Sequence, residues 1–98
     1  MMKNGLIVEH NVKRWYKDGK LHREDGPAVE LTDGYKGWYK DNQYHREDGP
    51  AIEWPSGVKS WWFNGTQLST GNRGFWMLWD RLTDKQRGNP NLLRYMPR

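Results

Sequence analysis

Short runs of alternating apolar and polar residues fill the chain as far as about residue 71, and each run ends at residues that favour a turn. The pairs Asp18-Gly19, Asp41-Asn42 and Asn64-Gly65 lie 23 residues apart. Asn, Asp and Gly tolerate the positive φ angles that a type I′ turn needs at both central positions. The pattern predicts three β-hairpins, each closed by a two-residue turn.

The hairpins belong to a repeat with a period of 23 residues. The residues that align at this spacing are Trp15, Trp38 and Trp61 in one set and Lys13, Lys36 and Lys59 in another. The sequence HREDGPA occurs at residues 22–28 and again at 45–51, whereas the third position, residues 68–74, reads LSTGNRG. A degenerate last copy is typical of a terminal repeat.

The second loop of each unit sets the register of the strands. It reads Glu9-His10-Asn11, Thr32-Asp33-Gly34 and Pro55-Ser56-Gly57. We expect three-residue loops, because a two-residue loop would force Pro55 to pair in the ladder. In this register one face, the predicted core, collects Val29, Leu31, Tyr35, Tyr39 and Tyr44, with Leu6, Val8, Val12, Tyr16 and Leu21 one period earlier.

Beyond the repeats the apolar period changes to that of a helix. Phe75, Leu78, Trp79 and Leu82 fall at i, i+3, i+4 and i+7 and predict one helix of roughly 12 to 15 residues. We expect its cap at Thr70 or Asn72 and its end at Gly88 and Pro90. Asn89-Pro90 predicts a further helical turn within residues 91–96.

Together these patterns predict one mainly β domain. It is an antiparallel meander of three 23-residue hairpin repeats (residues 1–71, the third degenerate), capped by a C-terminal α-helix and tail (residues 72–98). We expect Asp48-Gly49 to make a bulge or bend in one long strand.

The doubled HREDGPA holds a histidine, an arginine and two carboxylates, which could perform acid–base chemistry. His22, Arg23, Glu24 and Asp25 are consecutive, however, and neighbours on a strand point to opposite faces. We therefore interpret the motif as a connector. An enzyme that uses His22 or His45 with Glu24 or Glu47 is the alternative, and it would need a cleft that the sequence does not suggest.

The connector interpretation assigns a role to each residue of the motif. Asp25 and Asp48 would bond the backbone of the turn, Gly26 and Gly49 would adopt positive φ, and Pro27 and Pro50 would lead back into the strand. Arg23 with Glu47, or Arg46 with Glu24, could pair between repeats.

The tryptophans beside this motif form the candidate binding face. Trp15, Trp38 and Trp61 point away from the tyrosine side, with His22 opposite Trp15 and His45 opposite Trp38. The candidate residues are Trp15, Trp38, Trp61, Lys13, Lys36, Lys59, His22 and His45. Aromatic rings between lysines would suit a single-stranded nucleic acid or another anionic ligand. Alternatively each Trp packs on lysine stems and the neighbouring histidine, or under the C-terminal helix.

Composition and charge narrow the kind of protein and the kind of partner that we expect. Mean hydropathy is -1.13, but seven Trp and five Tyr supply an aromatic core, and the net charge of +4 favours an acidic partner. There is no cysteine, and His22 and His45 would lie about 10 Å apart, so we expect no metal and no cofactor. The apolar run near the N-terminus is too short for a signal peptide or a membrane span, so we expect a cytoplasmic protein.

The repeat resembles the MORN repeat, through Tyr35-x-Gly37-Trp38 followed by Asn42 and His45. It departs from that pattern in the position of the tryptophan and in Arg46, where the family has glycine. The HREDGPA ending is similar to a variant found in short bacterial and phage proteins. The resemblance covers about residues 6–71, and it implies a sheet that serves as a platform for protein partners, in some cases for lipids, and no reaction.

We therefore expect a non-enzymatic protein-binding module. The tail residues Leu92, Leu93, Tyr95 and Met96 are apolar and would add a partner contact or a homodimer contact. If the phage association holds, the module would be an inhibitor that occludes a host defence enzyme. Binding of single-stranded nucleic acid or an anionic ligand through the Trp and Lys face is the alternative.

Overall fold

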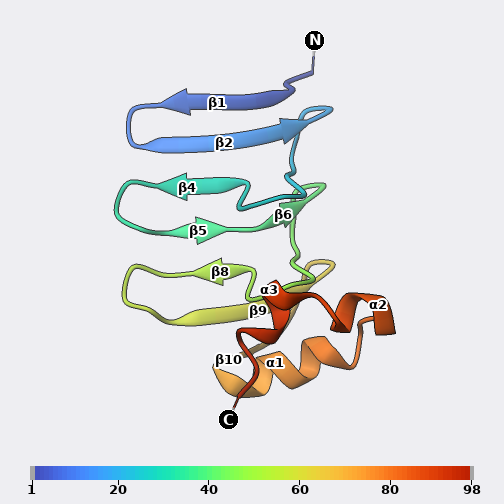
Figure 1. Cartoon of the computed structure of the whole chain (residues 1–98). Helices are drawn as coiled ribbons and strands as arrows, with labels where there is room; N and C mark the ends of the chain where they lie inside the picture. Colours follow the sequence, from blue (N-terminus) through green and yellow to red (C-terminus); the bar gives the residue numbers. More distant parts are fainter. Residues whose placement is uncertain (1, 98) are drawn as a thin grey trace.

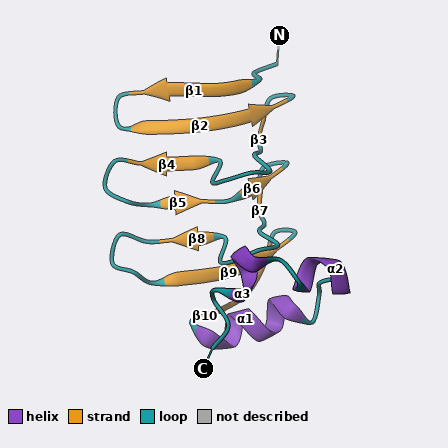
Figure 2. Ribbon diagram, in the orientation of Figure 1, coloured by secondary structure: helices purple, strands orange, loops and turns teal. Residues whose placement is uncertain are grey.

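Antiparallel strands follow one another across a long sheet, and three short helices lie at its C-terminal end (Figures 1 and 2). The computed structural model describes residues 2–97. The predicted mainly β fold is confirmed, with 35% strand and 17% helix. The elements are β1 (Gly5–Glu9), β2 (Val12–Lys17), β3 (Lys20–Leu21), β4 (Val29–Leu31), β5 (Lys36–Gly37), β6 (Tyr39–Lys40), β7 (Gln43–Tyr44), β8 (Ile52–Glu53), β9 (Lys59–Phe63), β10 (Thr66–Thr70), α1 (Asn72–Trp79), α2 (Asp84–Arg87) and α3 (Pro90–Leu93).

The main sheet has the order β1-β2-β4-β5-β8-β9-β10, and β3 also pairs with β2. The hairpin β6-β7 forms a separate two-stranded sheet. All pairings are antiparallel. The sheet therefore grows along one direction, with β1 at one edge and β10 at the other.

The three predicted type I′ turns are confirmed by their backbone angles. The φ values are 50° and 80° at Asp18-Gly19, 49° and 67° at Asp41-Asn42, and 48° and 79° at Asn64-Gly65. Two of the three-residue loops are confirmed as well, since the N–H of Leu31 donates to the carbonyl of Tyr35 and that of Trp54 to the carbonyl of Val58, both at 3.0 Å.

The first loop differs from the prediction, and the difference turns the side chains of β1 to the opposite face of the sheet. Glu9 pairs with Val12, so His10 and Asn11 form a two-residue turn in which His10 has φ 45°. A shift of one residue in register moves every side chain of a strand to the opposite face. The prediction that Leu6 and Val8 belong to the core was therefore wrong.

On β1, Leu6 lies opposite Trp15 and Val8 opposite Lys13, and their exposed fractions are 49% and 58%. The other members of the predicted core face remain only half-buried. These are Val12, Tyr16, Leu21, Val29, Leu31, Tyr35, Tyr39 and Tyr44. Over the described residues that face is a half-buried surface of tyrosine and aliphatic side chains without a second layer.

The buried core instead lies at the C-terminal end of the sheet. It consists of Trp61, Leu68, Phe75, Leu78, Leu82 and Leu92. Helix α1 packs on β9 and β10, and the ring of Phe75 meets that of Trp61 edge to face, with centroids 6.0 Å apart. A helix layer is needed here because the last strands have no further repeat to cover them.

The C-terminal segment divides differently from the single helix that was predicted. Helix α1 has eight residues, and α2 begins after a capping box in which Thr83 Oγ1 accepts from the N–H of Gln86 and Gln86 Oε1 accepts from the N–H of Thr83. The sequence Thr-x-x-Gln is the pattern of a capping box and indicates a helix start at this position. The cap of α1 is Gly71, at φ 73° and without a side-chain bond, rather than Thr70 or Asn72.

Helix α3 follows the prediction, because Asn89 Oδ1 accepts from the N–H of Asn91 and Pro90 is the first helical residue. None of the helices within residues 2–97 combines the length and the apolar character needed to cross a membrane.

Gly74 provides a test of the core. A Cβ atom at this position would overlap the indole of Trp61, so we expect Gly74→Ala to lower the free energy of unfolding by roughly 1–3 kcal/mol. Gly88→Ala is the matched control, since its Cβ would meet the carbonyls of Lys85 and Asp84 at ordinary contact distances of 3.6 and 4.0 Å and it should be neutral or stabilise by about 0.4–1 kcal/mol. Urea titration followed by tryptophan fluorescence measures both. Equal stability of the two variants would contradict this packing.

Candidate functional site

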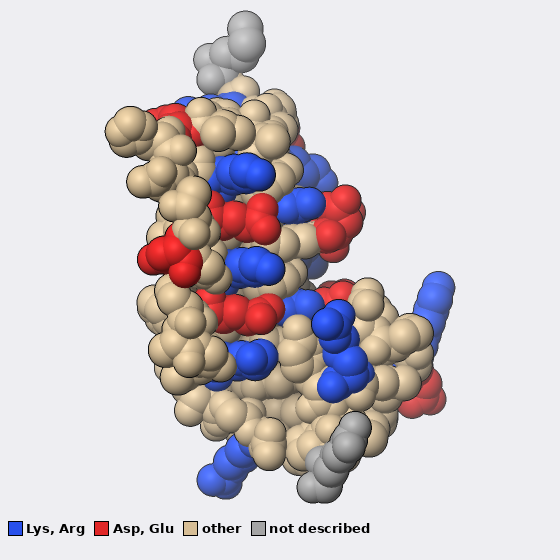
Figure 3. All heavy atoms as spheres, turned by 60° about the vertical axis from the view of Figure 1, so that its left-hand side comes forward, with Lys and Arg blue, Asp and Glu red and all other residues tan. Residues whose placement is uncertain are grey.

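The predicted binding face carries a row of alternating charges. The strand registers place Lys13 opposite Glu30, Glu30 opposite Lys36, Lys36 opposite Glu53, and Glu53 opposite Lys59. Figure 3 shows the corresponding column of basic and acidic side chains. Each lysine therefore has an acidic neighbour about one strand spacing away, which cancels most of the positive potential of the row.

The tryptophans of this face are covered. The guanidinium carbon of Arg23 lies 3.9 Å from the ring centroid of Trp15, and that of Arg46 lies 3.8 Å from the centroid of Trp38. Both distances are within the range of cation–π contacts. Trp61 is buried in the core. The structure brings the eight candidate residues onto one face, but it presents no open row of indole rings there.

The arginines lie in the HREDGPA loops. The first and last residues of each loop bond the same tryptophan, so the chain leaves the edge of a strand and returns to it. Trp15 accepts from the N–H of His22 at 3.0 Å and donates to the carbonyl of Ala28 at 2.8 Å. Strands β3 and β4 thus share one edge of β2, with the loop between them. Asp48 and Gly49 do lie in a bend, but the single long strand that was predicted is interrupted, because β7 ends at Tyr44 and β8 begins at Ile52. Trp38 makes the same contacts with His45 and Ala51.

Each arginine forms hydrogen bonds to other residues of its own loop. Arg46 Nε donates to Asp48 at 2.8 Å, and its Nη1 donates to the Pro50 carbonyl at 3.0 Å and to Glu53 at 3.2 Å. Arg23 bonds Asp25 and the Pro27 carbonyl in the same way.

Two predictions are corrected by these contacts. Among the described residues Asp25 and Asp48 bond arginine rather than the backbone, and neither Arg23–Glu47 nor Arg46–Glu24 forms a pair. Pro27 and Pro50 do precede the residues at which strand pairing resumes.

The glycines of the motif serve a purpose other than the predicted one. Gly26 and Gly49 are absent from the residues at positive φ. A Cβ atom would lie 2.8 Å from the guanidinium carbon of Arg23 at position 26, and 2.6 Å from that of Arg46 at position 49. A side chain at either position would therefore displace the arginine that packs against it.

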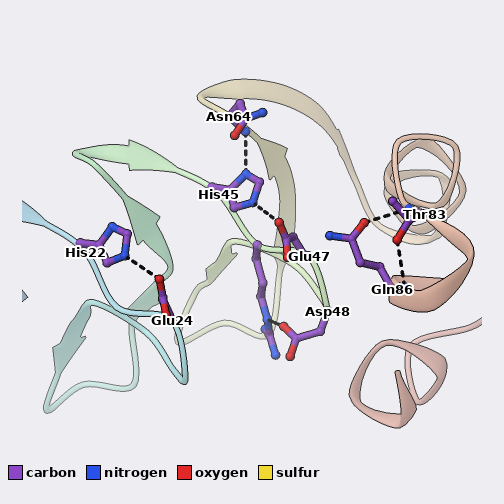
Figure 4. Close-up of polar contacts among 9 residues, drawn as sticks. His22, Glu24, His45, Glu47, Asp48, Asn64, Thr83 and Gln86 are labelled. Carbon is purple, nitrogen blue, oxygen red and sulfur yellow. Dashed lines mark hydrogen bonds and ion pairs between the residues drawn. The ribbon is translucent and has the colours of Figure 1, made fainter. Parts of the chain in front are cut away.

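The histidines join each hairpin to the next one, and Figure 4 shows this bond for His45. His45 Nδ1 accepts from the N–H of Asn64 at 2.8 Å, and His22 Nδ1 accepts from that of Asp41 at 3.2 Å. An accepting Nδ1 places the proton of the neutral ring on Nε2. This atom faces Glu47 at 3.2 Å in one copy and Glu24 at 3.5 Å in the other. Both nitrogens of each buried ring are engaged.

A groove of about 340 Å³ brings the two copies of the motif together, contrary to the expectation that they share no cleft. Its lining residues are His22, Arg23, Glu24, Trp38, Tyr39, Lys40, His45, Arg46, Glu47, Asp48 and Asn89. Three basic side chains face three carboxylates, and the histidines already have partners. Within residues 2–97 no group of three or more His, Asp or Glu is arranged to hold a metal ion. The groove offers hydrogen-bonding groups to a ligand but no unengaged base.

The predicted tail residues divide into two pairs. Leu92 is part of the core, and the ring of Tyr95 packs on Trp61 and lies 5.5 Å from the guanidinium of Arg46. Leu93 and Met96 are exposed. Only the second pair is available to a partner.

A surface that the sequence reasoning missed lies on the helices. The exposed fraction of Trp76 on α1 is 45%, and the segment around it is basic. Residues 1–71 hold 10 basic and 10 acidic side chains, whereas residues 72–98 hold 6 basic and 2 acidic ones. The net charge of the whole chain, +4, therefore comes from residues 72–98. Counting charges by segment would have shown this. Arg87 of this segment is paired with Asp84. We call the exposed residues Trp76, Leu93 and Met96, together with the basic residues Arg73, Arg81, Lys85 and Arg94 of the same segment, the helical surface.

Neither a protein-family model nor a curated protein or solved structure matches this chain.

The histidine contacts predict a structural effect. His45→Ala should lower the free energy of unfolding by roughly 1–3 kcal/mol, because the Asn64 N–H loses its acceptor and Phe63 its packing against the ring. Lys40→Ala, on an exposed position of the preceding hairpin, should change it by less than about 0.5 kcal/mol. Chemical denaturation measures both variants, and a neutral His45→Ala would contradict the proposed role of the ring.

The arginine contacts predict a titration effect. The hydrogen bond and charge of Arg23 lower the pKa of the Asp25 carboxyl below its ordinary value of 3.8. Since folding lowers this pKa, the pair stabilises the folded chain above the ordinary value, and the contribution is lost as pH falls through the lowered one. Arg23→Gln should raise the pKa of Asp25, and Arg14→Gln should not. Carboxyl NMR titration measures the shift, and the same pKa in both variants would exclude the contact in solution.

Proposed function

We propose that the chain is a non-enzymatic protein-binding module that binds an acidic surface of its partner through the helical surface. The observation that carries the proposal is the charge distribution: the net charge of the sheet segment is zero, and the excess of four positive charges lies in the segment with the exposed Trp76, Leu93 and Met96. Tryptophan and arginine dominate many protein interfaces, and positive charge speeds association with an acidic partner.

The sheet then acts as a rigid support for the helices. Its charges compensate one another, and its hydrogen bonds join successive hairpins through His22 and His45. The resemblance to the MORN repeat is in keeping with a scaffold. Its variant in short bacterial and phage proteins leads us to propose further that the module inhibits a host enzyme by covering its surface.

Two other functions receive less support from the geometry. Nucleic-acid binding by the Trp and Lys face would need indole rings open to bases, whereas arginines cover Trp15 and Trp38 and the lysines alternate with Glu30 and Glu53. Acid–base catalysis in the groove would need a histidine nitrogen free to accept a proton, and both nitrogens of His22 and His45 are engaged.

Trp76 and Trp54 supply a matched pair for the test, since their exposed fractions are 45% and 44% on different surfaces. Trp76→Ala should weaken binding to the captured partner by at least about 30-fold, the effect of losing a hot-spot residue, while Trp54→Ala retains it. The measurement is capture from bacterial lysate by the immobilised chain, followed by titration of the enriched protein at low and moderate salt.

Three results would refute the proposal. Capture could enrich no protein, the two variants could bind equally, or salt could leave the affinity unchanged. Oligonucleotide binding that survives Trp76→Ala and is lost in Trp38→Ala would favour the nucleic-acid function instead.

A further inference from the structure

Strand β1 leaves its outer edge unpaired at the end of the sheet opposite the helices (Figure 1). Among the described residues β1 pairs only with β2, while α1 packs against β10 at the other end. Residues 3 and 4 do not cover this edge, because they bond the first type I′ turn: the Lys3 carbonyl accepts from Gly19 and Asn4 Oδ1 from Asp18. The edge presents free main-chain donors and acceptors.

This edge has few of the features that keep edge strands from pairing, and its one charged residue, Glu9, is the last of the strand. Its sequence, Gly-Leu-Ile-Val-Glu, contains no lysine, arginine or proline. Val8 also occupies the place in the charge row beside Lys13 where the alternation would next require an acidic residue. The row thus changes from charged to apolar at β1, where the sheet ends. An apolar side chain at this position is expected if another strand covers the edge.

The directions of the backbone groups on β1 follow from its neighbour. The N–H and C=O of Trp15 both bond towards the β3 and β4 side of β2. Leu6, opposite Trp15, and Val8, two residues further, therefore direct their own N–H and C=O away from β2, whereas those of Ile7 point towards it.

We propose that β1 pairs with β1 of a second copy of this chain, antiparallel and with Ile7 on the two-fold axis. In this register Leu6 lies opposite Val8 of the second copy, and the two pairs exchange four main-chain hydrogen bonds. Leu6 and Val8 then cover each other on the face of the charge row, and the two Ile7 side chains meet on the other face. No other strand of the sheet offers both an open edge and a self-complementary apolar pattern among residues 2–97.

A five-residue edge is small beside the roughly 1,200–2,000 Å² that stable interfaces bury, so the dimer dissociates on dilution. Light scattering of the full chain over a range of concentrations should show a mass that rises from monomer to dimer and no further. Val8→Pro should remain monomeric, because it removes an outward N–H and leaves the β1–β2 bonds intact. Val8→Lys should also remain monomeric, while Val58→Lys, whose side chain is 50% exposed away from the edge, should dimerise. Circular dichroism checks that each variant is folded.

Cross-linking tests the register, because the chain contains no cysteine. Non-hydrogen-bonded antiparallel pairs bring Cα atoms to about 4.5 Å, within reach of a disulfide. Ile7→Cys should form a covalent dimer on mild oxidation. Glu9→Cys should not, because Glu9 lies opposite Gly5 of the second copy.

The outcomes separate this inference from the proposed function. A monomer at every concentration, a dimer that survives Val8→Pro and Val8→Lys, or cross-linking of Glu9→Cys in preference to Ile7→Cys would overturn the pairing. Trp76→Ala should leave the dimer intact, so a failure of partner binding and a failure of dimerisation are distinguishable.

Discussion

The hydrogen bond from a turn N–H to the Nδ1 atom of a buried histidine is the contact on which the sheet depends. Most strands on the turn side, such as β3, β6 and β7, have only two residues, and such short hairpins do not form a stable sheet on their own. His22 and His45 each connect one hairpin to the turn of the next. The first turn has no histidine before it, and Asn4 supplies the acceptor in its place. The same need is met by a different residue where the repeat begins.

The motif that contains these histidines is accounted for by packing rather than by catalysis. Its arginine stacks on the tryptophan of the preceding hairpin, bonds the aspartate two residues later, and fills the space that glycine leaves. The arginine, the aspartate and the glycine of each loop thus contact one another. A sequence motif of this kind can recur unchanged because each copy meets the same neighbours, the tryptophan before it and the turn after it, and recurrence alone gives no reason to assign it a reaction.

Local chemistry determined which features the sequence could predict. The type I′ turns, the loops at residues 32–34 and 55–57, and the cap at Asn89 each follow from a few adjacent residues, and they were predicted correctly. The first loop was not, because His10 adopts positive φ without the glycine that normally marks such a position. The roles of Gly26 and Gly49 were also missed, since they depend on where an arginine side chain folds back. The core was misplaced because only tertiary packing decides which face a helix covers.

Function is best sought where the chain departs from its own repeat. Within the sheet the repeat balances charge against charge and covers its tryptophans, so the interior units present much the same compensated surface to any ligand. At β1 an apolar residue replaces the next acidic one, and after β10 the chain adds an exposed Trp76 and six basic residues against two carboxylates. Each departure exposes different groups to a partner. At one end these are main-chain donors and acceptors, and at the other they are basic side chains and the exposed Trp76. Because the two ends lie at opposite edges of the sheet, a self-association at β1 would leave the helical surfaces of both copies free, and one dimer could bind two acidic partners.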